Sequence, residues 1–355
     1  MGDQVIFVSL LDDDYSRSAV YLKQLEFNHE NIDYFRTSLK IKNLMRLIKA
    51  LRSKSSGQVI IMSPSHALVP FVKLFTNHKV ILDAGWSLTE STMLRNNGQR
   101  KKYDNFKTYA IDFLSTKFSD HIFVESQRQK AFFNEKFKTE LSKMSVLYTG
   151  FNELAFENIE AVVPYELHKY DLSQYFVIFL RGKINEEMGL DYLISVAKSV
   201  HDKSVLFIVS TSNGGIPAMH PLNMVFIDRY IENSEMKYLY LNCDLSVGQL
   251  GNVPRVQNSI AHKIFESLYF GVPLIIRKSW AVQEILNTND SAILLEEPLI
   301  NCFLENIEKI LKNPEILLKI KERYKKIHKE KTSQAVLTRK FLNDIENISN
   351  VHRYS

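Results

Sequence analysis

The sequence predicts an α/β protein built from two doubly wound domains. Short apolar runs alternate with amphipathic helical patterns along most of the 355 residues, which is typical of parallel sheets covered by helices on both faces. A weakly patterned segment at 149–174 interrupts this alternation, which then restarts. We therefore expect an N-terminal domain over residues 1–165 and a second domain over residues 166–330. A helical segment over 331–355 is expected to pack back on the N-terminal domain.

Each half begins with a strand and continues in strand–helix pairs. Continuous apolar runs rather than alternating ones indicate strands that are buried on both faces. In the first half, strands are expected at 4–11, 32–37, 58–64, 79–85, 121–126 and 143–148, with helices at 18–27, 42–53, 66–75, 103–118 and 127–137. In the second half, strands are expected at 175–182, 205–212, 224–231, 245–250 and 274–276, with helices at 190–200, 235–242, 258–270 and from about 305 onward.

Composition indicates an ordinary soluble globular protein, 45% hydrophobic and 24% charged. Cys243 and Cys302 lie far apart with no CxxC spacing, which argues against a disulfide framework or a cysteine zinc site and fits a reducing compartment. The first residues do not resemble a signal peptide, and no apolar run is long enough for a membrane span. These features predict a cytoplasmic protein.

Basic residues are concentrated in the first half. Seven lie between positions 35 and 54, where there is no acid, and apolar residues recur among them at helical spacing. A second cluster comprises Arg95, Arg100, Lys101 and Lys102. Such helices either contact an anionic membrane surface or are solvated faces packed on a sheet, and both interpretations stay open. Nucleic acid is not an expected partner, because no helix-turn-helix, zinc-finger or RNA-binding signature is present.

The helix expected at 258–270 carries a carboxylate, Glu266, on the side opposite its apolar face. Ser259 and Lys263 lie on the same side as Glu266, and so do two aromatic residues, Tyr269 and Phe270. Aromatic side chains are unusual on a helix face that meets only water. Because ligands of doubly wound domains bind at the carboxyl ends of the strands, we expect Glu266 to face a ligand-binding cleft.

Two blocks of the second half resemble the nucleotide-binding domain of GT-B glycosyltransferases, particularly of the family-4 type. The first is "GKINEEMGLDYLI" at 182–194, and the second is "NSIAHKIFESLYFGVPLI" at 258–275; "NCDLSVGQL" at 242–250 also fits in spacing. The resemblance covers residues 176–297, whereas over the first half it rests on architecture alone. It implies the GT-B fold, in which two Rossmann-like domains face a central cleft.

The resemblance also implies roles for residues of the second block. Glu266 occupies the place of the glutamate that binds the ribose hydroxyls, which suits paired, charge-assisted hydrogen bonds. Asn258 replaces the family's first glutamate, so it can bind a hydroxyl of the donor sugar but supplies no charge. Asn258 and Ser259 also suit a helix N-terminus, where free amides receive a diphosphate. Lys263 is expected to neutralise phosphate charge.

The first block departs from the family pattern. Lys183 stands where the family has a phosphate-binding arginine, which keeps the charge but loses the bidentate geometry. Met188 replaces a lysine and preserves nothing. Arg181 lies on the same side of the strand as Lys183 and is expected to compensate. The nucleobase is expected near Tyr230 and Ile231. The alternative for Lys183 and Arg181 is plain surface charge.

Aspartates of the first half are the candidates for contact with donor sugar or acceptor. Asp83 follows a central strand, where the family often has a residue that faces the cleft, and the alternative is a helix-capping role. Asp13, within the run Asp12–Asp14, is a candidate for binding acceptor hydroxyls or acting as a base. A metal-binding DxD interpretation of this run is rejected, because that motif lies deeper in its domain.

The sequence thus predicts a glycosyltransferase that moves a sugar from a nucleotide sugar to a glycan, glycolipid or polyprenyl-linked acceptor. Retention of configuration and independence from metal or other cofactors are implied by the resemblance. The alternatives are a GT-B-like sugar-nucleotide epimerase and a non-catalytic GT-B partner subunit. A peripheral location on the inner face of the plasma membrane follows if the basic helices bind anionic lipid.

Overall fold

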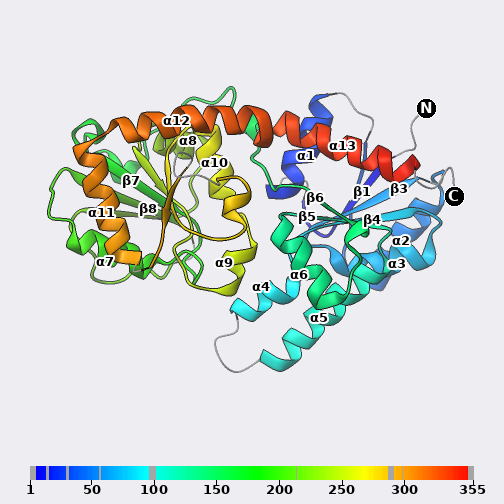
Figure 1. Ribbon diagram of the computed structural model, residues 1–355. Coiled ribbons are helices and arrows are strands. Elements are labelled where there is room, and N and C mark those ends of the chain that lie inside the picture. Colours follow the sequence, from blue (N-terminus) through cyan, green and yellow to red (C-terminus); the bar gives the residue numbers. More distant parts are fainter. Residues whose placement is uncertain are drawn as a thin grey trace. The chain divides into compact units, whose positions relative to one another are not determined.

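The computed structural model describes residues 5–12, 16–28, 32–55, 57–95, 101–212, 214–286, 292–297 and 299–350. The chain divides into two compact units, Met1–Asn152 with Gln334–Ser355 and Glu153–Ser333 (Figure 1). The second unit begins earlier than the predicted boundary at 165. The reason is that the expected linker packs on this unit: Lys237 Nζ donates to the carbonyls of Phe156 and Ile159, at 3.0 and 2.8 Å.

The described residues of the first unit form a six-stranded parallel sheet in the order β2-β1-β3-β4-β5-β6. Every strand lies where a continuous apolar run predicts one. The strands are β1 (Val5–Ser9), β2 (Asp33–Arg36), β3 (Gln58–Met62), β4 (Lys79–Gly85), β5 (His121–Val124) and β6 (Met144–Val146).

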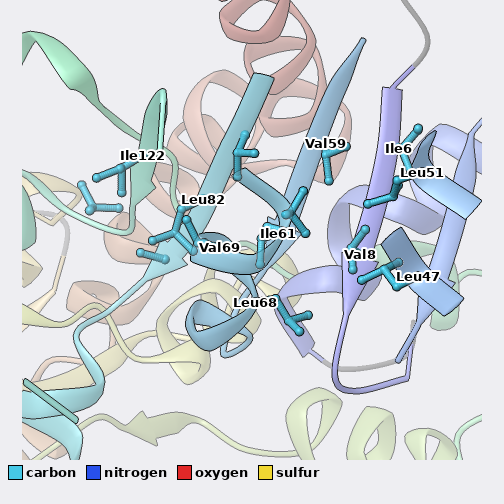
Figure 2. Close-up of a cluster of buried hydrophobic side chains, with 14 of the residues drawn as sticks. Ile6, Val8, Leu47, Leu51, Val59, Ile61, Leu68, Val69, Leu82 and Ile122 are labelled. Carbon is cyan, nitrogen blue, oxygen red and sulfur yellow. The ribbon is translucent and has the colours of Figure 1, made fainter. Parts of the chain in front are cut away.

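Each face of this sheet has its own apolar core, because successive side chains of a strand point to opposite faces. Ile6 and Val8 of β1 pack toward one face, with Leu47 of α2 (Figure 2), whereas Phe7 packs toward the other face, with Phe341 of α13. The first core also contains residues of α3 and α6, and α1 lines the second core. The helices are α1 (Ser16–Phe27), α2 (Ile41–Arg52), α3 (Val69–Phe75), α4 (Leu88–Arg95), α5 (Lys101–Phe118), α6 (Gln127–Phe137) and α13 (Gln334–Asn350).

The second unit contains a parallel sheet that, over the described residues, has the order β12-β11-β10-β7-β8-β9. Helix α7 packs on α11, and α10 packs on α8 and α12. The strands are β7 (Phe176–Arg181), β8 (Val205–Thr211), β9 (Met224–Asp228), β10 (Leu245–Val247), β11 (Leu274–Arg277) and β12 (Ile293–Leu295). The helices are α7 (Leu190–Ser199), α8 (Asn233–Leu241), α9 (Pro254–Asn258), α10 (His262–Phe270), α11 (Leu299–Lys312) and α12 (Glu315–Ile327). The predicted α/β class is therefore confirmed.

The helix predicted over 258–270 is wrong in its first turn. Asn258 ends the short helix α9, and α10 begins only at His262, after Ala261 with extended dihedral angles of −65° and 144°. The apolar spacing continues across this break because Ile260 is buried although it is not helical. The predicted end is correct, since Gly271 closes α10 in the left-handed conformation, at a φ of 68°.

None of the helices within the described ranges is both long and apolar enough to cross a membrane.

Candidate functional site

The candidate site lies at the carboxyl edge of the second sheet, where β7 ends. Strand β7 lies between β10 and β8, and the order of the strands reverses beside it. Such a switch point leaves a crevice at the carboxyl ends of the strands of doubly wound sheets. Arg181 is the last residue of β7, and Gly182 and Lys183 follow it. The first resemblance block thus starts at the crevice.

Glu266 of α10 forms the centre of a hydrogen-bonded cluster below this edge. Its Oε1 accepts from Arg181 Nη1 at 2.5 Å, and its Oε2 accepts from the hydroxyl of Tyr240 at 2.6 Å. Tyr240 belongs to α8 and is held between aromatic rings, since it stacks on Phe270 and meets the edge of Phe179, with ring centroids 4.8 and 5.2 Å apart. Three secondary-structure elements therefore fix the carboxylate.

Burial and charge act in opposite directions on this cluster. Glu266 is 4% exposed; burial raises the pKa of its carboxyl, but the charge of Arg181 and the hydrogen bond from Tyr240 outweigh burial, so that the pKa is lowered. Burial raises the pKa of the Tyr240 hydroxyl well above its ordinary value. Glu266 is therefore a carboxylate at neutral pH, and Tyr240 is a hydrogen-bond donor.

Arg181 is the member of the cluster that reaches solvent. Its side chain is 33% exposed, against 5% for Glu266. Both oxygens of Glu266 already accept a hydrogen bond. This geometry favours a role of Glu266 in orienting Arg181. A ribose hydroxyl would have to use the remaining lone pairs of the carboxylate.

A pocket of about 170 Å³ opens beside Arg181. Strands β7 and β8 and the segment after β9 contribute to it, and Tyr230 and Ile231, where the nucleobase was expected, line it. Tyr230 is 71% exposed, whereas Ile231 is 8% exposed. The lining residues are Arg181, Gly182, Lys183, Ser210, Thr211, Ser212, Arg229, Tyr230 and Ile231.

Lys263 of α10 lies over the glycine that follows β7. A Cβ at Gly182 would stand 3.7 Å from Lys263 Nζ, and Gly182 has a φ of 139°. Within the described ranges, neither Lys263 nor Lys183 forms a hydrogen bond or ion pair through its side chain. Burial lowers the pKa of the Lys263 amine to about 8, although the charge of Glu266 opposes this effect. Two ammonium groups with no hydrogen-bond or ion-pair partner among the described residues therefore stand near Arg181.

The rest of the first block packs tightly against the loop after β10. A Cβ at Gly251 would lie 1.8 Å from the carbonyl oxygen of Glu186, so a glycine is required there. Glu187 accepts from Gln249 Nε2 at 2.8 Å and from Arg255 Nη1 at 2.5 Å. Met188 is 2% exposed, which explains why an apolar residue stands where the family has a lysine.

Asn258 and Ser259 do not begin α10, so the predicted role of these two residues as the diphosphate-binding helix start is wrong. They lie at the end of α9 and in the link to α10, and they are 7% and 4% exposed. The start of a helix lies instead at the first turn of α10, which begins at His262.

Asp83 of β4 is fully paired with Arg17 of α1. Arg17 Nε donates to both carboxylate oxygens at 2.9 Å, and Nη2 donates to Oδ1 at 2.7 Å. Nη2 also donates to the carbonyl of Leu147 at 2.9 Å, and Nη1 donates to Thr149 Oγ1 at 3.3 Å. Because Arg17 and Asp83 are at most 1% exposed, the pair ties α1, β4 and the end of β6 together. This geometry favours a structural role for Asp83 over contact with substrate.

Two further acids of the first unit, Asp12 and Glu90, are also held by neighbours. Asp13 lies outside the described residues, and the exposed Asp12 pairs with Arg36. Glu90 accepts from Gln129 Nε2 at 2.6 Å and is 5% exposed.

Two site residues escaped sequence analysis. Tyr240 lies within an ordinary helical pattern, which carries no signal for its contact with Glu266. Arg229 follows β9 and lines the pocket, and it is held by Glu166 and Glu235 at 2.9 and 2.6 Å. A basic residue at a strand end beside the expected nucleobase site was the available signal.

Comparisons with known proteins agree with this fold. Residues 168–327 match the family model described as "Glycosyl transferases group 1". Solved structures with similar folds include Anabaena HepE, with a TM-score of 0.72, 11% identity and coverage of 97% of this chain and 100% of that chain. Sucrose-phosphate synthase from Thermosynechococcus elongatus has a TM-score of 0.74 and 11% identity, with coverage of 98% of this chain and 100% of that chain. A glycosyltransferase from Rickettsia africae has a TM-score of 0.72 and 14% identity, with coverage of 99% of this chain and 100% of that chain. No curated protein sequence matches significantly.

The fold is that of the GT-B glycosyltransferases, as the two sequence blocks predicted, and the family match supports a transferase. The match to the model of the group 1 glycosyl transferases lies within the second unit.

Proposed function

We propose that the protein transfers a sugar from a uridine diphosphate sugar, and that the second unit holds the nucleotide. The observation that carries this proposal is the cationic crevice itself. Arg181, oriented by Glu266, and the two unpaired lysines Lys183 and Lys263 surround the end of β7. Charge-assisted hydrogen bonds from such groups suit a diphosphate. Anabaena HepE has been solved with UDP and with UDP-glucose, which supports uridine as the nucleoside.

In this proposal the cations act mainly on the departing nucleotide. The bond between the sugar C1 and the diphosphate oxygen breaks, and the negative charge that develops on that oxygen is stabilised by Lys263, Arg181 and the amides of the first turn of α10. The acceptor hydroxyl then forms the new bond to C1 and gives its proton to the departing phosphate. We propose that the configuration at C1 is retained. We also propose that no metal is needed, because protein cations neutralise the charge.

The nucleoside diphosphate affinity is expected to fall at alkaline pH. The pKa of Lys263 is about 8, so the ammonium is charged at pH 7 and loses its proton as the pH rises through 8. If this charge binds the diphosphate, the Kd for UDP should rise about tenfold between pH 7 and pH 9. Calorimetric titration at a series of pH values measures the change.

Lys263→Met provides the control for this pH dependence. The variant should bind UDP more weakly at pH 7, and its Kd should stay nearly constant up to pH 9. An unaltered pH dependence in Lys263→Met would assign the titration to another group and remove Lys263 from the diphosphate site.

A nucleotide panel and a product analysis test the proposed activity against its rivals. UDP at about a hundred times its Kd should stabilise the protein by about 2.7 kcal/mol, and GDP or ADP should do so much less. Release of UDP from a UDP-sugar that requires an acceptor supports a transferase. Conversion into an epimeric UDP-sugar without an acceptor supports the epimerase, and binding without turnover over a broad acceptor panel supports a partner subunit.

We also propose that α2 rests on an anionic membrane. Its inward side is buried, but Ile41 and Met45, one turn apart, are 80% and 64% exposed. Exposed lysines and an arginine follow at neighbouring positions of the helix, namely Lys42, Arg46 and Lys49. A row of exposed apolar residues beside a basic row is typical of interfacial helices. The second predicted basic cluster carries no part of this proposal, because the structure does not describe the side chains of its residues.

Vesicle co-sedimentation tests this placement. The protein should pellet with vesicles that contain anionic lipid and stay in solution with neutral ones, and salt should weaken the binding. The double variant Ile41→Ser/Met45→Ser should bind less. Equal binding to both kinds of vesicle would contradict an electrostatic anchor, as would no binding to either.

A further inference from the structure

A second hollow lies within the first unit, where β2 ends and α2 begins. Its volume is about 590 Å³. One part of its wall is apolar and the other part is polar, and both charged side chains in the wall are arginines. The described residues that line it, none of them acidic, are Leu10, Phe35, Arg36, Thr37, Ser38, Asn43, Arg46, Leu47 and Ala50. This composition suits a ligand that has an apolar part and a negative charge.

The wall of this hollow is fixed by hydrogen bonds and by the core. The backbone N–H of Thr37 donates to the carbonyl of Ser9 at 2.9 Å, which holds the end of β2 on β1. Asn43 Nδ2 donates to Ser38 Oγ at 2.8 Å and ties the β2–α2 loop to the helix. Leu47 is 5% exposed and packs in the core of the first sheet (Figure 2). The hollow is therefore a feature of the folded unit.

The positive charge at this hollow is only partly balanced. Arg36 pairs with Asp12, and both side chains are more than half exposed. Arg46, in contrast, forms no ion pair or hydrogen bond through its side chain with the residues that the structure describes. No acid occurs between positions 35 and 54 to compensate it. A free guanidinium offers two parallel donors, the arrangement that binds phosphate in bidentate fashion.

We propose that this hollow binds the phosphate group of an amphiphilic molecule. Arg46, with help from Arg36, holds the phosphate, and Leu10, Phe35 and Leu47 contact the apolar part. The inference deepens the proposed function, because it assigns the sugar acceptor to the phosphate-bearing lipids. This assignment rests on the proposed transferase activity. Binding of the phosphate amphiphile itself does not depend on the transferase activity.

Dodecyl phosphate, kept below its micelle concentration, is a suitable probe for the whole chain. Calorimetry should show saturable binding of one molecule per chain, with affinity about tenfold or more weaker in Arg46→Gln, since a charge-assisted bidentate contact is lost. Lys107→Gln is the matched control, because Lys107 of α5 is an exposed cation of the same unit that does not line the hollow. Equal loss in both variants would overturn the proposal in favour of general surface charge.

Two further ligands separate the sources of the phosphate. Inorganic phosphate should bind more weakly than dodecyl phosphate by about tenfold or more, because burial of the apolar chain is missing, and dodecyl maltoside should not compete. Equal affinity for inorganic phosphate would overturn the amphiphile. UDP binding by the same samples separates the two proposals. Loss of UDP binding alone would remove the proposed function, and failure of dodecyl phosphate alone would remove this hollow as a site.

Discussion

Replacing Asp83 by alanine should lower the free energy of unfolding of the first unit by about 3–5 kcal/mol. The substitution leaves Arg17, which is 0% exposed, without its carboxylate. Burial lowers the pKa of Arg17, but the charge of Asp83 outweighs this effect in the native protein, so that the pKa is raised. Without Asp83, the hydrogen-bond acceptors that a buried guanidinium keeps among the described residues are the carbonyl of Leu147 and the hydroxyl of Thr149.

Urea unfolding can follow the first unit alone. The chain has two tryptophans, and Trp86 is the one in the first unit, so a Trp280→Phe background reports that unit by fluorescence. Glu26→Ala is the control, because the exposed Lys23–Glu26 pair should contribute less than about 1 kcal/mol. The double variant Arg17→Met/Asp83→Leu should recover much of the loss. A loss of under about 1 kcal/mol in Asp83→Ala would contradict the structural role.

Replacing Glu266 by alanine should weaken UDP binding by about 10- to 100-fold, since hydrogen bonds to charged groups contribute about 1.5–3 kcal/mol. The reason is indirect. Without the carboxylate, Arg181 loses the acceptor that fixes its direction, and the buried hydroxyl of Tyr240 loses its partner. A UDP titration measures the change, at a temperature where circular dichroism shows the variant to be folded.

Three further variants distinguish a positioning role of Glu266 from a general loss of structure. Glu266→Gln keeps an acceptor but loses the charge, so its affinity should fall between those of the wild type and the alanine variant. Arg181→Ala should bind UDP as weakly as Glu266→Ala does. The double variant should bind UDP only slightly more weakly than either single variant, because the two residues act as a unit. Glu186→Ala, an exposed acid of the same block, should bind normally. Full affinity in Glu266→Ala would remove Glu266 from the site.

The fold was largely predictable because its strands are buried on both faces. In a chain where strand and helix patterns alternate, continuous apolar runs such as residues 58–62 and 205–211 predict strands buried on both faces. Both runs are fully buried strands. The start of α10 was not predictable in this way. Burial at Ile260 and Ile264 gives helical spacing, but Ala261 between them has extended dihedral angles. Hydrophobic spacing indicates which residues are buried but carries no information on the backbone conformation.

The site was predictable in its location but not in its contacts. Strand-end position placed Arg181 and Lys183 at the crevice, and helical spacing placed Glu266 and Lys263 on one side of α10. The sequence does not reveal that Glu266 holds Arg181, because 85 positions separate the two residues. The same holds for Asp83, whose partner Arg17 lies 66 positions away. Pairing of distant residues depends on the packing of whole elements, which local patterns do not contain.

The central claim, that the pocket at the end of β7 holds the nucleotide, is tested most directly by calorimetric titration of UDP with three proteins. Ser212→Trp puts a large side chain at an exposed position that lines the pocket, and Leu222→Trp puts the same side chain at a fully exposed position of the same unit that does not. We predict one UDP per chain for the wild type and Leu222→Trp, and no binding by Ser212→Trp. Wild-type protein that binds no UDP, or Ser212→Trp with full affinity, would contradict the account.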